Sequence, residues 1–100
     1  MEVVFVDELP NIVTAAQRGD IDAFTELVRR YQDLAFAAAY ARLRDTHLAQ
    51  DVAQEAFLQA HRDLPMLREP AAFPHWLRRI VAKYVDRVVR GPQTADRAAA

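Results

Sequence analysis

Two carboxylates, Asp51 and Glu55, are four residues apart in a stretch of helical periodicity, and Gln54 lies beside them. A spacing of four places both carboxylates on one face of a helix. The neighbouring positions carry no counter-charge at close spacing, so this acidic face can receive Arg or Lys side chains from a partner, ideally as bidentate Arg–carboxylate contacts. The alternative interpretation is an ordinary solvated helix face.

Further along the chain, Arg79, Lys83 and Arg87 follow one another in steps of four, and Arg90 adds a step of three. Only Asp86 opposes them within the segment. A basic stripe with this spacing can follow the phosphates of a nucleic acid. Here too, a merely solvated helix face is the alternative.

His75 and Trp76 open the same basic segment, directly after a Pro-bracketed stretch. An aromatic side chain at a helix start, beside basic residues, can stack on an unpaired base. Trp76 also continues an apolar stripe with Ile80 and Tyr84, however, and this pattern favours a place in the core.

Catalytic or metal-binding chemistry finds no support in the residue pattern. His61 is six residues from Glu55, and His47 precedes Asp51 by four but stands alone, so no His-Glu-x-x-His motif is formed. The chain contains no cysteine, and we find no nucleophile motif, phosphate-binding loop or cofactor fingerprint. We therefore expect no catalytic residues, no metal and no cofactor, and a protein that is not an enzyme.

The net charge of −1 hides an asymmetry along the 100 residues. Residues 1–60 contain five Arg and ten Asp or Glu, whereas residues 61–100 contain eight Arg or Lys and four Asp or Glu. One acidic and one basic partner surface would explain this division, and chance is the alternative. The sequence shows no signal-peptide pattern and no apolar stretch long enough for a membrane span, so we expect a cytoplasmic protein.

The periodicity predicts an all-α domain, a compact bundle of about four helices. Capping and breaker residues set the expected ends: Gly19 after the first helix, Asp20 or Asp22 before the second, Thr46 before the third, and Gly91 with Pro92 after the fourth. The expected helices span residues 10–18, 23–43, 47–64 and 73 to 89 or 90.

Apolar side chains at helical spacing predict the core. Those expected from the second helix are Phe24, Leu27, Val28, Tyr31, Leu34, Ala35 and Ala38, widened by Phe36, Tyr40 and Leu43. Those expected from the third are Leu48, Val52, Ala56, Phe57 and Ala60, with Phe73 at the start of the fourth.

Three segments together resemble region 2 of the extracytoplasmic-function (ECF) sigma factors. They are AAQRGDIDAFTELVRRYQ at residues 15–32, AQDVAQEAFLQAHRDL at 49–64 and FPHWLRRIV at 73–81. The resemblance extends over about residues 9–90 and implies the sigma region 2 fold. We expect residues 1–90 to form this domain and residues 91–100 to begin a linker or tail.

The resemblance implies a role in transcription initiation without ATP hydrolysis or a covalent step. In this family an acidic helix binds the clamp helices of the RNA polymerase β′ subunit, and the matching residues are Asp51, Gln54 and Glu55. The loop between helices three and four, with the start of helix four, captures a flipped base of the melted non-template strand of the promoter −10 element. The residues to which the resemblance assigns DNA binding are Arg62, Arg68, His75, Trp76, Arg79, Lys83 and Arg87.

Two departures from the family pattern bear on these expectations. Many members carry Asn where this chain has Lys83; Asn reads adenine most simply, whereas Lys favours guanine acceptors or phosphate, and both roles stay open here. The −35-reading helix-turn-helix domain that normally follows is absent, so we expect this chain to be part of a longer protein.

The alternative to a sigma domain is a helical protein-interaction module without DNA binding. Burial of Arg79, Lys83 and Arg87 in ion pairs with the acidic half would favour that alternative. Many relatives have an anti-sigma factor, for which the sequence gives no evidence either way. We expect no membrane partner, and a monomer, because no apolar heptad seam is left over.

Overall fold

The computed structural model describes the backbone of residues 5–99 and the side chains of residues 8–91. Its elements in chain order are α1 (Phe5–Gln17), α2 (Ile21–Leu43), α3 (Thr46–Asp63), the 3₁₀ turns η1 (Leu64–Met66) and η2 (Pro70–Ala72), and α4 (Phe73–Ala99). Every element in this part of the chain is helical, which confirms the predicted all-α class.

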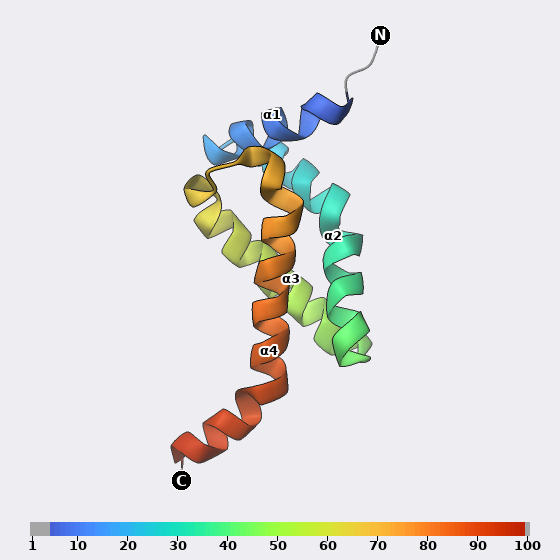
Figure 1. Cartoon of the computed structure of the whole chain (residues 1–100), viewed down its shortest axis with the longest axis vertical. Helices are drawn as coiled ribbons and strands as arrows, with labels where there is room; N and C mark the ends of the chain where they lie inside the picture. The colour runs from blue at the N-terminus through green and yellow to red at the C-terminus, as the bar shows by residue number, and fades with distance from the viewer. Residues whose placement is uncertain (1–4, 100) are drawn as a thin grey trace.

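The helices pack around a single core. In Figure 1, α2 and α4 run lengthwise, α3 crosses obliquely behind α4, and α1 lies across one end beside the connection from α3 to α4. Each of the three long helices contacts the other two. None of the helices in the described range is long and apolar enough to span a membrane.

Side-chain caps begin the two central helices. The Asp20 carboxylate accepts a hydrogen bond from the Ala23 N–H at 3.1 Å, and the Asp45 carboxylate accepts one from the Leu48 N–H at 2.9 Å. Asp20 was one of the two predicted caps, but the prediction of Thr46 is wrong by one residue. Asp45 can serve because the preceding Arg44 adopts a left-handed conformation (φ 55°) and closes α2.

The buried core draws on all four helices. Its fully buried large side chains are Phe73, Leu27, Leu64, Leu77, Val13, Val81 and Val85. Alanine supplies much of the remainder: Ala35, Ala39, Ala49, Ala56 and Ala60 are each 0% exposed. These small side chains lie on the inward sides of α2 and α3.

Leu48 was predicted to face inward, and this is wrong: it is 39% exposed, and Ala49 is buried instead. Ala49, Val52, Ala56 and Ala60 follow steps of three and four, so they form the inward row of α3. Leu48 lies about 100° to the side of this row.

The ends of α1 and α4 also differ from the prediction. α1 begins at Phe5, so Pro10 lies inside the helix rather than in its first turn. α4 continues through Gly91 and Pro92 to Ala99, so the predicted stop there is wrong. Proline has a helix-compatible φ and can bend a helix without ending it. Figure 1 shows the C-terminal end of α4 turning away from the axis of the rest.

Candidate binding surfaces

The acidic face of α3, formed by Asp51, Gln54 and Glu55, points to solvent. All three residues are exposed, and they lie opposite the buried alanine row. Neither carboxylate takes part in an ion pair within residues 8–91. The face therefore has the unpaired negative charge that the sequence predicts.

Two further residues share the outer side of α3. Leu58 is 57% exposed, four residues after Gln54. Arg62 is exposed and follows Leu58 by another four, so helical geometry places it on the row of Asp51 and Leu58. Arg62 is thus at the loop end of the acidic face, and not on the basic face of α4.

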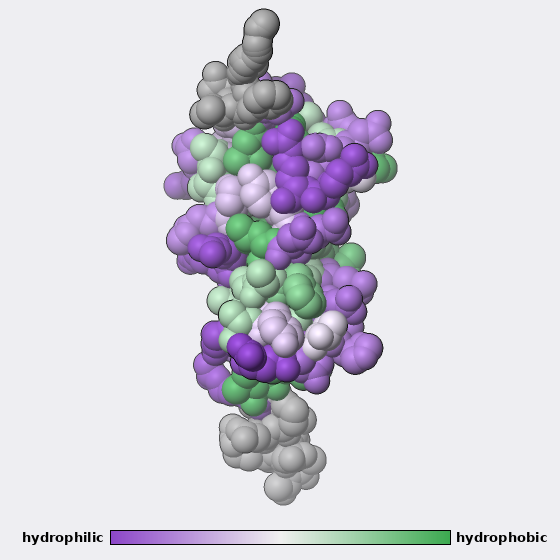
Figure 2. Space-filling view, turned by 90° about the vertical axis from the view of Figure 1, so that its right-hand side faces the viewer, coloured by the Kyte–Doolittle hydropathy of each residue, from purple (hydrophilic) through white to green (hydrophobic). Residues whose placement is uncertain are grey.

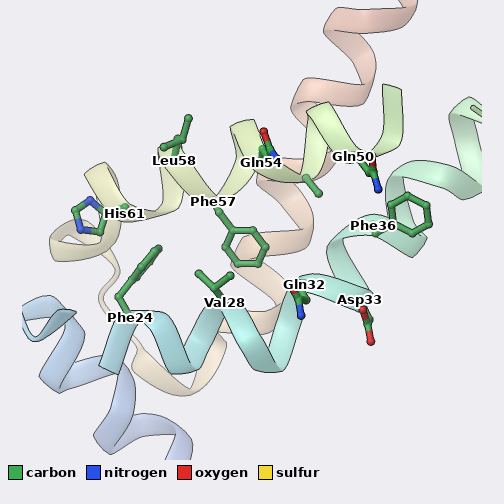
Figure 3. A pocket seen from close by; sticks show the side chains of 11 residues that line it. Phe24, Val28, Gln32, Asp33, Phe36, Gln50, Gln54, Phe57, Leu58 and His61 are labelled. Atoms are coloured by element: carbon green, nitrogen blue, oxygen red, sulfur yellow. The ribbon is translucent and has the colours of Figure 1, made fainter. Parts of the chain in front are cut away.

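An apolar groove of ≈ 840 Å³ lies between α2 and α3. Figure 3 shows Phe24 and Val28 of α2, and Phe57 of α3, pointing into the space between the helices. At one end the Phe24 and His61 rings meet edge to face, with centroids 4.8 Å apart. Gln54 also lines the groove and thereby joins it to the acidic face.

Sequence reasoning missed this groove. The periodicity assigned Phe24, Val28 and Phe36 to the core, yet each is only half-buried. A helical stripe tells which side chains face a neighbouring helix, but not whether the two helices close completely over them. Figure 2 shows that apolar residues reach the surface between hydrophilic ones on the face it presents.

The basic face of α4, formed by Arg79, Lys83 and Arg87, is exposed along its length. None of the three makes an ion pair with a carboxylate among the side chains that the structure describes. Lys83 Nζ and the Arg87 guanidinium both lie against the Tyr84 ring, 5.3 and 5.0 Å from its centroid. The burial in ion pairs that would favour a module without DNA binding is therefore not seen here.

Asp86, the one carboxylate within this stripe, is directed elsewhere. It pairs with Arg42 of α2 at 3.2 Å and with Arg90 at 3.9 Å. Its charge is therefore shared with residues outside the basic face. Arg90, unlike the three residues of that face, has a carboxylate partner.

Trp76 has a position compatible with both interpretations that the sequence left open, core packing and contact with a base. It is half-buried and packs against the core, with its ring centroid 5.9 Å from that of Phe73. On α4 it lies seven residues before Lys83 and therefore on nearly the same side. His75 and Arg68, the other predicted contacts near the loop, are exposed.

The connection between α3 and α4 is more ordered than a simple loop. It contains η1 and η2, and it is held from α1 by Gln17, whose side-chain amide donates to the carbonyl oxygens of Leu64 (3.0 Å) and Leu67 (2.8 Å). These partners are 47 and 50 residues away in the chain, so no local pattern indicates them.

Among residues 8–91, one cluster of charges shows perturbed ionisation. Arg30 donates to Glu26 at 2.8 Å and to Glu8 at 2.9 Å. The hydrogen bond from Arg30 lowers the pKa of Glu26, and the bonds to Glu26 and Glu8 raise that of Arg30. The cluster includes no residue of either charged face and links α1 to α2. Within the described residues, no group of three or more His, Cys, Asp or Glu could hold a metal ion.

Comparison with known proteins places this arrangement in a family. Residues 27–91 match the family described as Sigma-70 region 2. The chain is 40% identical over 87 residues to the RNA polymerase sigma-H factor of Pseudomonas aeruginosa, covering 85% of this chain and 45% of that protein. It is 37% identical over 89 residues to the ECF RNA polymerase sigma-E factor of Escherichia coli, covering 85% and 46%.

A solved structure is similar throughout the bundle. It is the NMR structure of the complex formed by an engineered region 2 of sigmaE with GTAAAA, with a TM-score of 0.75 and 31% identity over 84% of this chain and 90% of that one. The chain spans about half the length of the curated relatives it matches. It belongs to the sigma-70 region 2 family and is similar there to ECF sigma factors, whose domains of this type act in transcription initiation.

Proposed function

We propose that this chain docks on the β′ clamp helices of RNA polymerase through the acidic face of α3. We further propose that it holds the melted non-template strand of the promoter −10 element with the α3–α4 connection and the basic face of α4. The observation that carries the proposal is the separation of two exposed faces of opposite charge on adjacent helices, neither neutralised by the other. The resemblance predicts the same two faces.

Docking would use charge and apolar contact together. Asp51 and Glu55 can accept Arg or Lys side chains of the clamp helices, and Gln54 can donate or accept a hydrogen bond between them. The α2–α3 groove continues this face through Gln54 and Leu58, so we assign it to an apolar side chain of the same partner. Charge would then steer the encounter, and the groove would contribute buried area.

Strand capture would work by trapping bases once they are unpaired. The phosphates would follow Arg79, Lys83 and Arg87, while Arg68, His75 and the exposed edge of Trp76 would contact a base held near the connection. Arg62 would contact the strand from the end of α3. The similar solved complex contains the oligonucleotide GTAAAA, which supports a single strand as the ligand class.

This mechanism uses binding energy alone. Members of the sigma family are not enzymes, and we propose the same for this chain, acting in the cytoplasm as a monomer on polymerase and promoter. The family match ends at residue 91, in keeping with our proposal that residues 1–90 form the binding domain and residues 91–100 begin a linker.

The decisive experiment is titration of this chain into a purified β′ clamp-helix fragment at low and moderate salt. We expect salt-sensitive binding that Asp51→Arg combined with Glu55→Arg abolishes while the far-UV circular dichroism stays native. A matched control is Asp22→Arg with Glu69→Arg, which makes the same change of net charge at two exposed carboxylates outside α3 that form no ion pair among residues 8–91. Normal binding by the α3 double variant would show the docking assignment to be wrong.

A further inference from the structure

The connection between α3 and α4 presents one turn to solvent between two anchored ends. Leu64, at the start of η1, is 1% exposed, and Leu67, just after it, packs against the core. Between them Met66 is 77% exposed. The turn thus stands out from the bundle between Arg62 and Arg68, two of the proposed DNA contacts.

Little holds this turn from within. A 3₁₀ helix of three residues has few and poorly aligned hydrogen bonds. Its closing bond runs from the Leu67 N–H to the Leu64 carbonyl at 3.0 Å. Pro65 in the turn has no N–H to contribute.

Gln17, the last residue of α1, supplies the external support. Its Nε2 donates one hydrogen bond to the Leu64 carbonyl and another to the Leu67 carbonyl. The amide thereby uses both of its N–H groups on the two ends of one turn. The Leu64 carbonyl oxygen accepts two hydrogen bonds, one from the Gln17 side chain of α1 and one from the Leu67 N–H that closes the turn.

We propose that Gln17 is a positioning residue for strand capture: it does not touch the DNA, but it holds η1 in the shape that presents the connection to an unpaired base. This inference rests on the proposed function and adds α1 to it. When a loop adopts its binding conformation for only a fraction of the time, its apparent affinity for the ligand is reduced by that fraction. Removing the amide should therefore weaken DNA binding without removing any DNA contact.

A role confined to overall stability would act differently. The acidic face lies toward the other end of α3, since Asp51 precedes Leu64 by thirteen residues, or ~20 Å along the helix. Loss of a positioning role should leave polymerase docking intact, whereas general destabilisation should lower docking and DNA binding together.

The test compares Gln17→Met and Gln17→Glu with the native chain. Methionine keeps the length and the apolar stem of the Gln17 side chain but has no hydrogen-bond donor. Glutamate keeps its shape but places carboxylate oxygens, which cannot donate, beside the Leu64 and Leu67 carbonyl oxygens. Gln59→Met is the matched control, because the Gln59 amide donates to the Asp63 carboxylate at 3.1 Å and not to the connection. The probe is the tightest single-stranded DNA hexamer selected by the native chain from a random pool, and docking is measured with the β′ clamp-helix fragment.

We expect Gln17→Met to lower hexamer affinity about tenfold, corresponding to the loss of one or two hydrogen bonds, and Gln17→Glu to lower it further. The backbone order parameter of Leu67 should fall toward ~0.6, and docking should not change. Unchanged hexamer affinity in Gln17→Met, or an equal loss of docking, would overturn the inference while the proposed function stands. If the native chain selects no hexamer, the proposed strand capture itself fails, and this inference fails with it.

Discussion

α3 and α4 both turn a charged face to solvent, yet they meet the core with different side chains. α3 buries mainly small residues, namely Ala49, Val52, Ala56 and Ala60, with Phe57 at the groove. α4 buries larger ones, namely Phe73, Leu77, Ile80, Val81 and Val85. The helix of the acidic face is therefore packed through mainly small side chains, and the helix of the basic face through larger apolar ones.

The two faces also differ in how their charges are compensated. On α4 the carboxylate that lies within the basic stripe, Asp86, pairs with Arg42 and Arg90 and not with Arg79, Lys83 or Arg87. On α3 the carboxylates have no cationic partner among residues 8–91, and Arg62 lies at the loop end of their row. Each face thus keeps a charge of one sign, which suits two partners of opposite charge.

The difference in packing gives the largest expected effects. Leu77→Ala should destabilise the fold by about 3 kcal/mol, because it opens a cavity beneath α4. Ala56→Leu should destabilise it by about 2 kcal/mol for the opposite reason, since the added atoms force α3 away from its neighbours. Urea denaturation followed by circular dichroism measures both. Leu58→Ala, at an exposed site, is the control. Equal urea midpoints for all three variants would contradict the proposed difference in packing between α3 and α4.

Reversing the basic face should separate its role from that of the acidic one. Arg79→Glu with Arg87→Glu should weaken single-stranded DNA binding by about 100-fold at low salt, because two phosphate-attracting charges become repulsive. Docking on the clamp-helix fragment should be unaffected. Arg29→Glu with Arg44→Glu gives the same change of net charge on exposed residues of another part of the surface. If that control loses as much affinity, the DNA does not recognise α4 in particular.

Lys83→Ala sharpens the assignment within the basic face, with an expected loss of a few-fold in affinity. If Lys83 touches phosphate, every DNA sequence should be weakened equally, and the slope of log affinity against log salt should decrease by about 0.7. If it reads a base, the preference at one −10 position should change instead. Fluorescence anisotropy over a set of single-base variants distinguishes the two, with Arg90→Ala, whose partner is Asp86, as the comparison variant.

The smallest effect concerns the cluster of Arg30, Glu8 and Glu26, outside both faces. Because the folded-state pKa of Glu26 is lowered, its contribution to stability is present above the unfolded value of about 4.3 and is lost as the pH falls through the folded value. Glu26→Gln should slightly reduce the loss of stability between neutral and acidic pH. It should leave the binding of both partners at neutral pH unchanged. Thermal unfolding from pH 3 to pH 7 checks this. If the unfolding temperature of the variant falls at acidic pH as much as that of the native chain, the Glu26–Arg30 pair contributes nothing measurable.

Local patterns were sufficient for the helical class and for most of the core. Leu27, Ala35, Val52 and Ala60 are buried as their helical spacing predicts. The errors concern competition between neighbours: Asp45 caps α3 although Thr46 is also a good cap, and Ala49 takes the inward place predicted for Leu48. In both cases the choice is between adjacent residues of α3, one for the N-cap and one for the buried position. The sequence pattern allows either residue, and the packing of the helix against its neighbours determines which one is selected.

The charged faces were predictable because each is contained in one helix. The groove and the support from Gln17 were not, since each depends on how two separate helices meet. Gly91 and Pro92 gave a misleading signal, because a proline removes one hydrogen bond from a helix but does not forbid its continuation. The predicted roles of the site residues await the binding experiments.

The contribution of α1 bears on where this domain can be cut. The family match begins at residue 27, inside α2, yet Val13 is 0% exposed and Gln17 reaches the connection beyond α3. A fragment trimmed to the matched residues would expose the core side chains among which Val13 is buried, and would remove the support of the turn at Met66 by Gln17. Anyone preparing a minimal version for crystallisation or for transplantation into another sigma factor should therefore retain the segment from Glu8 onward.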